Sequence, residues 1–381
     1  MNSLFKYVSK YGNLSFKEEK FNDVDNVILS VLSYIKFDGI VSKGRMGITL
    51  KEAADIYFTR YSKKDLNNNI FSIKSAIKLF SFIKDYKRYQ ELVLYNYIYF
   101  DSSDEQFSAL CIKISDDLIY VSFEGTDEVV SGWKEDFELS YMFPIPAQLD
   151  AISYLNKSIK LKDKKIIVGG HSKGGNLAVV AAMYCNFYIR NKIIKIYSND
   201  GPGFLEEEIN SRKFKKIKSR YVHLIPNCSI VGVLLNNSND KVIKSSSKGI
   251  LGHDALTWEV EDNHFVSSDL NKDSLVLKNI MIKWLDEYSF EKRMICVSEL
   301  FKILESNNIY TLLDLKKKGI MGVIKIIKDS KEIDEVAKEM FKQLLTLIYN
   351  DYSSMFKEKF SFNKNKEVEE WYLWEKSLQI L

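Results

Sequence analysis

The spacing of apolar positions changes twice along this chain of 381 residues. Residues 1 to about 100 are mainly predicted to be helical, because apolar side chains recur every three or four positions. The segment 23–34 predicts a helix with Asp23 as its cap, and Thr49 is the candidate cap of a helix over 49–60. An aromatic run over 95–100 then predicts a strand.

From about residue 107, short apolar runs alternate with helical segments. Two runs on either side of Ser115-Asp116-Asp117 predict a hairpin. Further strands are expected at 165–169, 193–198 and 220–225, and helices at 147–160 and 175–190. Beyond about 273 the chain is again helical. This alternation indicates an α/β fold with a mostly parallel sheet flanked by helices, between a helical lead-in and a helical C-terminal region.

Composition narrows the class of protein. Apolar residues make up 46% of the chain, and no apolar run approaches the roughly 18 residues of a membrane-spanning helix. The first residues lack the basic-then-apolar plan of a secretory signal, so we expect a cytoplasmic protein. The four cysteines are scattered, and Cys111 and Cys185 are expected to be buried thiols.

The charge of the chain bears on its partners. A net charge of +4 is too small at this length to predict a nucleic-acid partner. A basic run over 212–220, together with the aromatic run over 95–100, suggests a peripheral contact with a membrane. A solvated face that borders the sheet is the simpler interpretation of the basic run. The oligomeric state stays open.

The segment 166–180 holds the most specific chemical signal. A β-branched run leads into Gly-x-Ser-x-Gly at 170–174, and small residues at helical spacing follow. This order of strand, tight turn and helix is typical of a nucleophile elbow. Side chains at Gly170 or Gly174 would collide with the neighbouring strand and helix. The pattern predicts Ser172 as a nucleophile, with a structural turn as the alternative.

A serine hydroxyl needs a base, and the chain has four histidines. His171 is expected to pack behind the elbow, and His223 lies within an apolar strand and is expected in the core. His253 follows a glycine in a loop, precedes an apparent strand over 255–260, and comes late in the chain, as the hydrolase order requires. His264 lies in a polar turn. We therefore expect His253 to be the base, with an exposed loop residue as the alternative.

The acid that orients the histidine should follow a strand, because the carboxyl ends of parallel strands face the active-site crevice. Asp200 follows the strand predicted over 193–198. The turn after the next strand offers Asn227 and Ser229 but no carboxylate. Asp200 is the candidate acid, with an Asx turn that shapes the loop as its alternative role.

An oxyanion hole needs backbone N–H groups aimed where negative charge develops. One is expected from Lys173, directly after the nucleophile, and one from Thr126, after a strand that breaks at Gly125. An ordinary strand-ending turn is the alternative at Thr126. No His or Cys set has metal-site spacing, and the elbow lacks the Gly-Lys-Ser/Thr order of a phosphate loop. The sequence therefore predicts neither a metal nor a cofactor.

Several segments, taken in order, resemble the Mbeg1-like family, which belongs to the α/β-hydrolase superfamily near the class 3, fungal-type lipases. The matching segments are 21–25, 29–34, 106–109, 123–127, 132–137, 146–148, 170–178, 200–204, 229–232 and 253–254. They leave the C-terminal region without a match. The resemblance implies an α/β-hydrolase fold with Ser172 as nucleophile and His253 as base.

Two departures from that pattern affect the chemistry. Lipase-like relatives usually carry arginine where this chain has Glu124, which reverses the charge beside the expected oxyanion strand. Class 3 lipases carry an aspartate where this chain has Asn227-Cys228-Ser229. Either Asp200 has taken the role of the acid, or the triad is incomplete.

These residues favour a serine hydrolase that cleaves a small carboxylic ester, lipid or acyl substrate through an acyl-enzyme on Ser172. The alternative is a hydrolase fold kept as a binding or regulatory module with little or no catalysis. The expected domains are an α/β-hydrolase domain over 1–272, which includes the lead-in over 1–100, and a helical region over 273–381.

Overall fold

The computed structural model describes residues 3–62, 66, 71–102, 106–126, 130–311, 314, 317–318, 322, 325–327, 330 and 333–359. Within these residues an eight-stranded sheet holds its strands in chain order. The strands are β1 (Ile48–Thr49), β2 (Val93–Asp101), β3 (Gln106–Ser115), β4 (Leu118–Phe123), β5 (Lys165–His171), β6 (Ile193–Asn199), β7 (Tyr221–Pro226) and β8 (Asp240–Ile243). Strands β1 to β4 pair antiparallel and β4 to β8 pair parallel, which confirms the predicted fold class.

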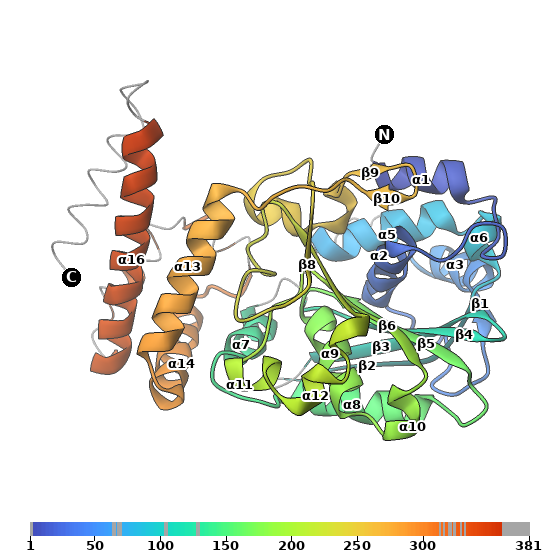
Figure 1. Ribbon diagram of the computed structural model, residues 1–381, viewed down its shortest axis with the longest axis horizontal. Helices are drawn as coiled ribbons and strands as arrows, with labels where there is room; N and C mark the ends of the chain where they lie inside the picture. Colours follow the sequence, from blue (N-terminus) through green and yellow to red (C-terminus); the bar gives the residue numbers. More distant parts are fainter. Residues whose placement is uncertain are drawn as a thin grey trace. The chain divides into compact units, whose positions relative to one another are not determined.

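Helices cover both faces of the sheet (Figure 1). Those of the first part of the chain are α1 (Ser3–Tyr11), α2 (Asp23–Val31), η1 (Leu32–Tyr34), α3 (Leu50–Arg60), α5 (Phe71–Ile83), α6 (Lys87–Gln90), α8 (Pro146–Ser158), α9 (Lys173–Tyr184), α10 (Phe187–Arg190), α11 (Glu206–Ile209), α12 (Arg212–Lys215), η2 (Lys218–Arg220), η3 (Gly249–His253) and η4 (Ala255–Thr257). α2 packs on one face, and α8 and α9 pack on the other. The small residues of α9 let this helix lie close to the sheet.

The predicted hairpin is confirmed, because β3 and β4 pair antiparallel. The aromatic run over 95–100 forms an inner strand of the sheet, β2, in which Tyr95 and Tyr97 are buried. The helix predicted over 175–190 is interrupted between α9 and α10. There the N–H of Asn186 donates to Asn156 Oδ1 at 2.8 Å instead of continuing a helical hydrogen-bond pattern.

One of the two predicted helix caps is confirmed. Thr49 caps α3, since its side chain accepts the Glu52 N–H and the Glu52 carboxylate accepts the Thr49 N–H. The prediction of Asp23 as the cap of α2 is wrong. Asn22 is the cap, because its Oδ1 accepts the N–H of Asp25 at 3.1 Å, and Asp23 is already the first helical residue.

A buried polar network fixes α2 against the strands below it. Asn199, which ends β6, donates through Nδ2 to Ser30 Oγ at 2.7 Å and to the Gly170 carbonyl at 2.9 Å. Asn26 Nδ2 donates to Asn199 Oδ1 at 2.8 Å, and the Tyr120 hydroxyl donates to Asn26 Oδ1 at 2.8 Å. Because a buried polar group without a partner is costly, this network permits one register of α2 on the sheet.

The strand predicted over 255–260 is wrong. This segment forms the short helix η4 and then β9 (Val260–Glu261), which pairs with β10 (His264–Phe265). Asp254 Oδ1 accepts the N–H of Leu256 at 3.0 Å, and the Trp258 indole donates to the Gly252 carbonyl at 2.9 Å. These two local hydrogen bonds fold the segment back before a strand can extend.

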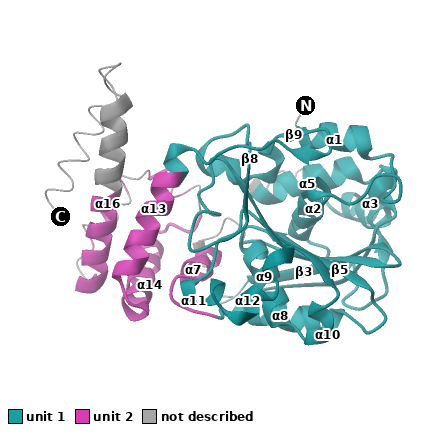
Figure 2. Ribbon diagram, in the orientation of Figure 1, with its two compact units in different colours: residues 1–128, 144–274 teal, residues 129–143, 275–381 magenta. Residues whose placement is uncertain are grey.

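The chain divides into two compact units (Figure 2). Unit 1 comprises Met1–Glu128 and Pro144–Ser274 and contains the sheet, and unit 2 comprises Val129–Phe143 and Leu275–Leu381. Further helices are α7 (Val130–Glu138), α13 (Lys272–Glu287), α14 (Phe290–Ser306) and α16 (Glu335–Lys359). Within unit 2, α7 packs on α14, and the ring centroids of Phe137 and Phe301 are 5.7 Å apart.

Two expectations from composition can be compared with the structure. All four cysteines are buried free thiols, as predicted for Cys111 and Cys185. Among the helices of the described residues, none combines the length and the apolar content that crossing a bilayer requires.

Candidate active site

Ser172 alone makes the tight turn that joins β5 to α9. Its backbone has φ 57° and ψ −135°, a conformation that residues other than glycine rarely adopt. The Ser172 N–H donates to the Asn199 carbonyl at 3.0 Å, and the Gly175 N–H donates to the Ser172 carbonyl at 2.9 Å. A strained serine between a strand and a helix has the geometry of a nucleophile elbow.

Glycine is required where other backbone segments press on the elbow. A Cβ on Gly174 would lie 2.1 Å from the Phe123 carbonyl oxygen, and a Cβ on Gly170 would lie 2.3 Å from the backbone of Gly174. A Cβ on Gly125 would lie 2.9 Å from the Cβ of Ser172. The two elbow glycines thus have a steric cause, and the residue after Glu124 lies directly against the candidate nucleophile.

The structure brings the candidate base and acid together. His253 Nδ1 lies 2.6 Å from Asp200 Oδ2. The Asp200 carboxyl is fully buried, and the His253 side chain is 21% exposed. Asp200 directly follows β6 with φ 51°, and its N–H donates to the Leu224 carbonyl at 2.7 Å. A carboxylate in this place orients the imidazole and leaves its Nε2 to accept a proton.

Residues of the turn after β7 hold the Asp200 carboxylate. Ser229 Oγ donates to Asp200 Oδ1 at 2.5 Å, and the Gly232 N–H donates to the same oxygen at 3.1 Å. With His253 on the other oxygen, the buried carboxylate accepts three hydrogen bonds, which offset its removal from water. Ser229 lies in the segment where class 3 lipases carry their aspartate. Here that segment supplies donors to the carboxylate of the preceding strand end.

His171, which was expected to pack behind the elbow, is buried and contacts the candidate base. Its ring centroid lies 4.5 Å from that of His253, and its Nε2 lies 2.8 Å from the His253 carbonyl oxygen. Burial lowers the pKa of His171 to about 3, so the ring is neutral. Because a carbonyl only accepts, Nε2 carries the hydrogen, and Nδ1 accepts the Tyr34 hydroxyl at 2.9 Å. Tyr34 and His171 thereby position the backbone of His253.

The remaining two histidines lie outside this cluster. His223 is fully buried, with Nδ1 at 2.8 Å from Asp240 Oδ1 and Nε2 at 3.1 Å from the Gly201 carbonyl oxygen. These two contacts tie the ring to β8 and to the loop that begins at Asp200. His264 is exposed in β10. Neither ring takes part in the hydrogen bonds of Asp200.

The candidate oxyanion groups lie on the two segments beside the serine. Lys173 is the first residue of α9, where backbone N–H groups lack helical partners and the helix dipole is positive. Its buried ammonium donates to the Gln106 carbonyl at 3.1 Å, so its side chain is engaged with β3. Thr126 is buried, and within the described residues its Oγ1 has no hydrogen-bond partner. A buried donor of this kind, three residues after β4 ends, suits a developing negative charge.

The reversed charge at Glu124 is neutralised locally. The Glu124 carboxyl is 1% exposed and lies 2.8 Å from Lys36 Nζ. The same ammonium lies 3.9 Å from the centroid of the Tyr99 ring. The ion pair ties the end of β4 to the segment after η1, next to Gly125.

Sequence reasoning missed the roles of Tyr34 and Ser229, although both lie in segments that matched the family pattern. Within the described residues, no hydrogen bond joins Ser172 Oγ to His253. Catalytic hydrogen bonds are commonly long before substrate binds. The Asp200–His253 pair and the elbow are therefore the defined parts of the site.

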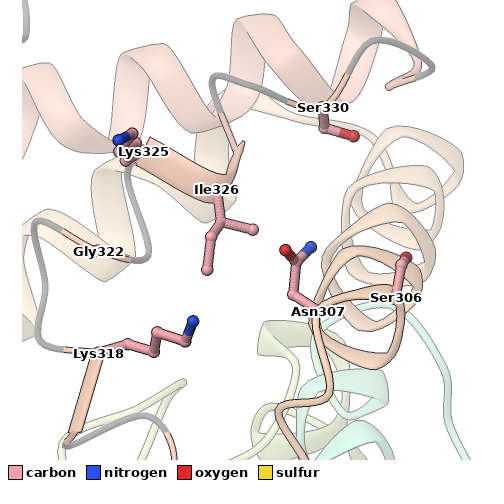
Figure 3. A pocket seen from close by; sticks show the side chains of 7 residues that line it. All are labelled: Ser306, Asn307, Lys318, Gly322, Lys325, Ile326 and Ser330. Carbon is pink, nitrogen blue, oxygen red and sulfur yellow. The ribbon is translucent and has the colours of Figure 1, made fainter.

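A cavity of about 410 Å³ lies elsewhere, in unit 2 (Figure 3). Its lining residues are Ser306, Asn307, Lys318, Gly322, Lys325, Ile326 and Ser330. None of them is a candidate catalytic residue.

The sheet turns from antiparallel to parallel, a strained serine follows β5, and Asp200 after β6 pairs with His253 of η3, which together define an α/β-hydrolase fold. The chain belongs to the Mbeg1-like family, whose model matches residues 83–302. Among solved structures, it is similar to the crystal structure of M37 lipase, with 15% identity, 69% of this chain and 81% of that chain covered, and a TM-score of 0.36. A comparison with curated proteins gives no match.

Proposed function

We propose that this protein is a serine hydrolase that cleaves carboxylic ester or acyl substrates through an acyl-enzyme on Ser172. The observation that carries the proposal is a strained serine turn together with a buried Asp200–His253 pair, 2.6 Å apart. Burying a charge is costly unless it is paired, and backbone strain persists only where the surroundings enforce it. A purely structural turn explains neither feature.

In the proposed acylation, Ser172 Oγ attacks the carbonyl carbon of the substrate, and its proton passes to His253 Nε2. The resulting imidazolium is stabilised by the Asp200 carboxylate. The carbonyl oxygen becomes an oxyanion that accepts hydrogen bonds from the backbone N–H groups of Lys173 and Thr126. When the tetrahedral intermediate collapses, the bond to the leaving alcohol breaks, and that oxygen takes the proton from His253.

Deacylation repeats these steps with water. His253 takes a proton from a water molecule, which attacks the acyl carbon, and the same N–H groups hold the second oxyanion. The bond to Ser172 Oγ then breaks, and Oγ recovers its proton from His253. The products are a carboxylic acid and an alcohol, and the enzyme is regenerated.

Other residues act in this scheme by positioning. Ser229 and Gly232 fix the Asp200 carboxylate so that its second oxygen faces His253. His171 fixes the carbonyl of His253 from behind. The scheme uses no metal and no cofactor, and we place the reaction in the cytoplasm with a small ester or lipid as substrate.

Hydrolysis of short-chain p-nitrophenyl esters tests the proposal. Ser172→Ala should lower kcat/KM by at least about a thousandfold. Ser246→Ala, which removes an exposed hydroxyl, is the matched control and should keep the native rate. Full activity in Ser172→Ala would end the proposal. A folded native protein that hydrolyses no ester would instead favour the fold as a binding or regulatory module.

A further inference from the structure

The most exposed large apolar side chains of the described chain are gathered on neighbouring segments. They are Met46, Leu161 and Phe187, at 81%, 80% and 69% exposure. Single exposed apolar side chains are ordinary, but the gathering of the three most exposed ones is not.

Specific contacts tie these segments together. Arg45 Nη2 lies 2.6 Å from Asp163 Oδ2, which joins the loop of Met46 to the turn of Leu161. Lys192 Nζ donates to the Leu161 carbonyl at 2.7 Å, which joins that turn to the segment after α10. The three segments therefore meet beside the amino ends of β5 and β6.

This part of unit 1 is also strongly basic. We call the segments 42–47, 157–165 and 186–195 the basic edge. Their cationic residues are Lys43, Arg45, Lys157, Lys160, Lys162, Lys164, Lys165, Arg190, Lys192 and Lys195. Their single carboxylate, Asp163, is 8% exposed and paired with Arg45.

The neighbouring hairpin offsets part of this charge through two carboxylates, of which Asp116 pairs with Lys113 of the hairpin itself at 2.7 Å. Asp117 of the neighbouring hairpin pairs with Lys164 at 2.6 Å. The basic run over 212–220 adjoins the edge, because Arg220 Nη1 donates to the carbonyls of Arg190 and Ile193 at 2.6 and 2.7 Å. The basic run that was considered for contact with an anionic surface thus lies next to a larger basic surface.

We propose that the basic edge docks on the surface of an anionic lipid bilayer, with Met46, Leu161 and Phe187 entering the interfacial layer. Lysines and arginines near a membrane are attracted to anionic headgroups, and apolar side chains among them add burial in the acyl boundary. A nucleic acid would be held by the cations but would leave the aliphatic tips of Met46 and Leu161 in water. The combination favours a bilayer.

Docking by this edge leaves the candidate catalytic end free. β5 begins at Lys165 in the basic edge and ends at His171, beside Ser172. At about 3.3 Å per residue, the strand separates the two ends by roughly 20 Å. The proposal does not rest on the proposed function, and the two can fail separately.

Flotation of the full chain with phosphatidylcholine vesicles, with and without phosphatidylglycerol, tests the docking. The native chain should float with the anionic vesicles and not with the neutral ones. Lys160→Glu/Lys162→Glu should lower the partition coefficient at least about tenfold, because two attractions become repulsions. Leu161→Gln/Phe187→Gln should lower it about fivefold or more at unchanged charge.

Matched controls separate docking from folding and from net charge. Lys302→Glu/Lys338→Glu changes the charge equally at exposed positions of unit 2, and Ile56→Gln removes an apolar side chain that is 41% exposed on α3. Both should bind within about twofold of the native chain. Circular dichroism and hydrolysis of a soluble ester should be unchanged in all variants. A native chain that does not float, or edge variants that bind like the controls, would overturn the proposal. Vesicle binding that RNA abolishes, and that Leu161→Gln/Phe187→Gln leaves unchanged, would also overturn the proposal.

Discussion

Replacing Asp200 by Asn changes the candidate acid at nearly constant shape. The Asn side chain can still accept from Ser229 and Gly232 through its oxygen, as Asp200 Oδ1 does at 2.5 and 3.1 Å. Its amide group then faces His253 Nδ1, where the native Oδ2 accepts at 2.6 Å. Two donors would meet there, so the imidazole must move its hydrogen from Nδ1 to Nε2. An Nε2 that carries a hydrogen cannot accept the proton of Ser172.

The size of the effect follows from this change of tautomer. Loss of the acid in a serine triad lowers kcat by roughly a factor of 10⁴, which corresponds to about 5 kcal/mol of transition-state stabilisation. We expect a loss of about 10³ to 10⁴ in kcat/KM for Asp200→Asn. Ser229→Ala removes one donor and keeps the carboxylate, so its loss should be nearer tenfold, or about 1.5 kcal/mol.

Steady-state hydrolysis of a p-nitrophenyl ester measures both variants, and circular dichroism with thermal unfolding confirms that each is folded. The order of the losses matters most, since Asp200→Asn must be far worse than Ser229→Ala. A folded Asp200→Asn variant within tenfold of native kcat/KM would refute the assignment of Asp200 as the acid.

Three further predictions concern the surroundings of the site. Gly174→Ala should cost at least about 2 kcal/mol and lower Tm, because its Cβ would lie 2.1 Å from the Phe123 carbonyl oxygen; an unchanged Tm would contradict this packing. The unfolding free energy of the native protein should decrease as the pH is lowered from about 6 to about 3, by up to about 1.4 kcal/mol per pH unit. Over this range His171 binds a proton in the unfolded chain but stays neutral in the folded one, where its pKa is about 3. Urea titrations at several pH values should show that the unfolding free energy of His171→Gln depends less steeply on pH than that of the native protein. An equal pH dependence would argue against a neutral ring. Lys36→Met should destabilise by about 2 kcal/mol because it strands the buried Glu124 carboxylate, and the double variant with Glu124→Gln should cost less than the sum; additive costs would disprove the coupling.

The elements nearest the site could be predicted because short patterns specify them. Apolar runs gave the parallel strands, and the glycines of the elbow reflect backbone contacts that no other residue allows. Thr49 was predictable as a cap because its partner lies three residues away. Asn22 was not distinguished from Asp23, because both side chains suit a cap and only the register of the helix on the sheet decides.

Contacts between distant residues could not be predicted in the same way. Ser229 and Asp200 are 29 positions apart, and His171 and His253 are 82 apart. Their contacts depend on how the strand ends meet, which apolar spacing does not encode. The segment 255–260 has the composition of a strand, yet the Asp254 cap and the indole hydrogen bond of Trp258 fold it back.

Labelling with a fluorophosphonate, followed by intact-mass measurement, tests the central claim most directly. The reagent reacts with a serine only when a base has activated it. The native chain should gain one adduct in stoichiometric amount, Ser172→Ala should gain none, and Asp200→Asn should react far more slowly. A folded native chain that gains no adduct, or an adduct that persists in Ser172→Ala, would contradict the account of Ser172 as the nucleophile.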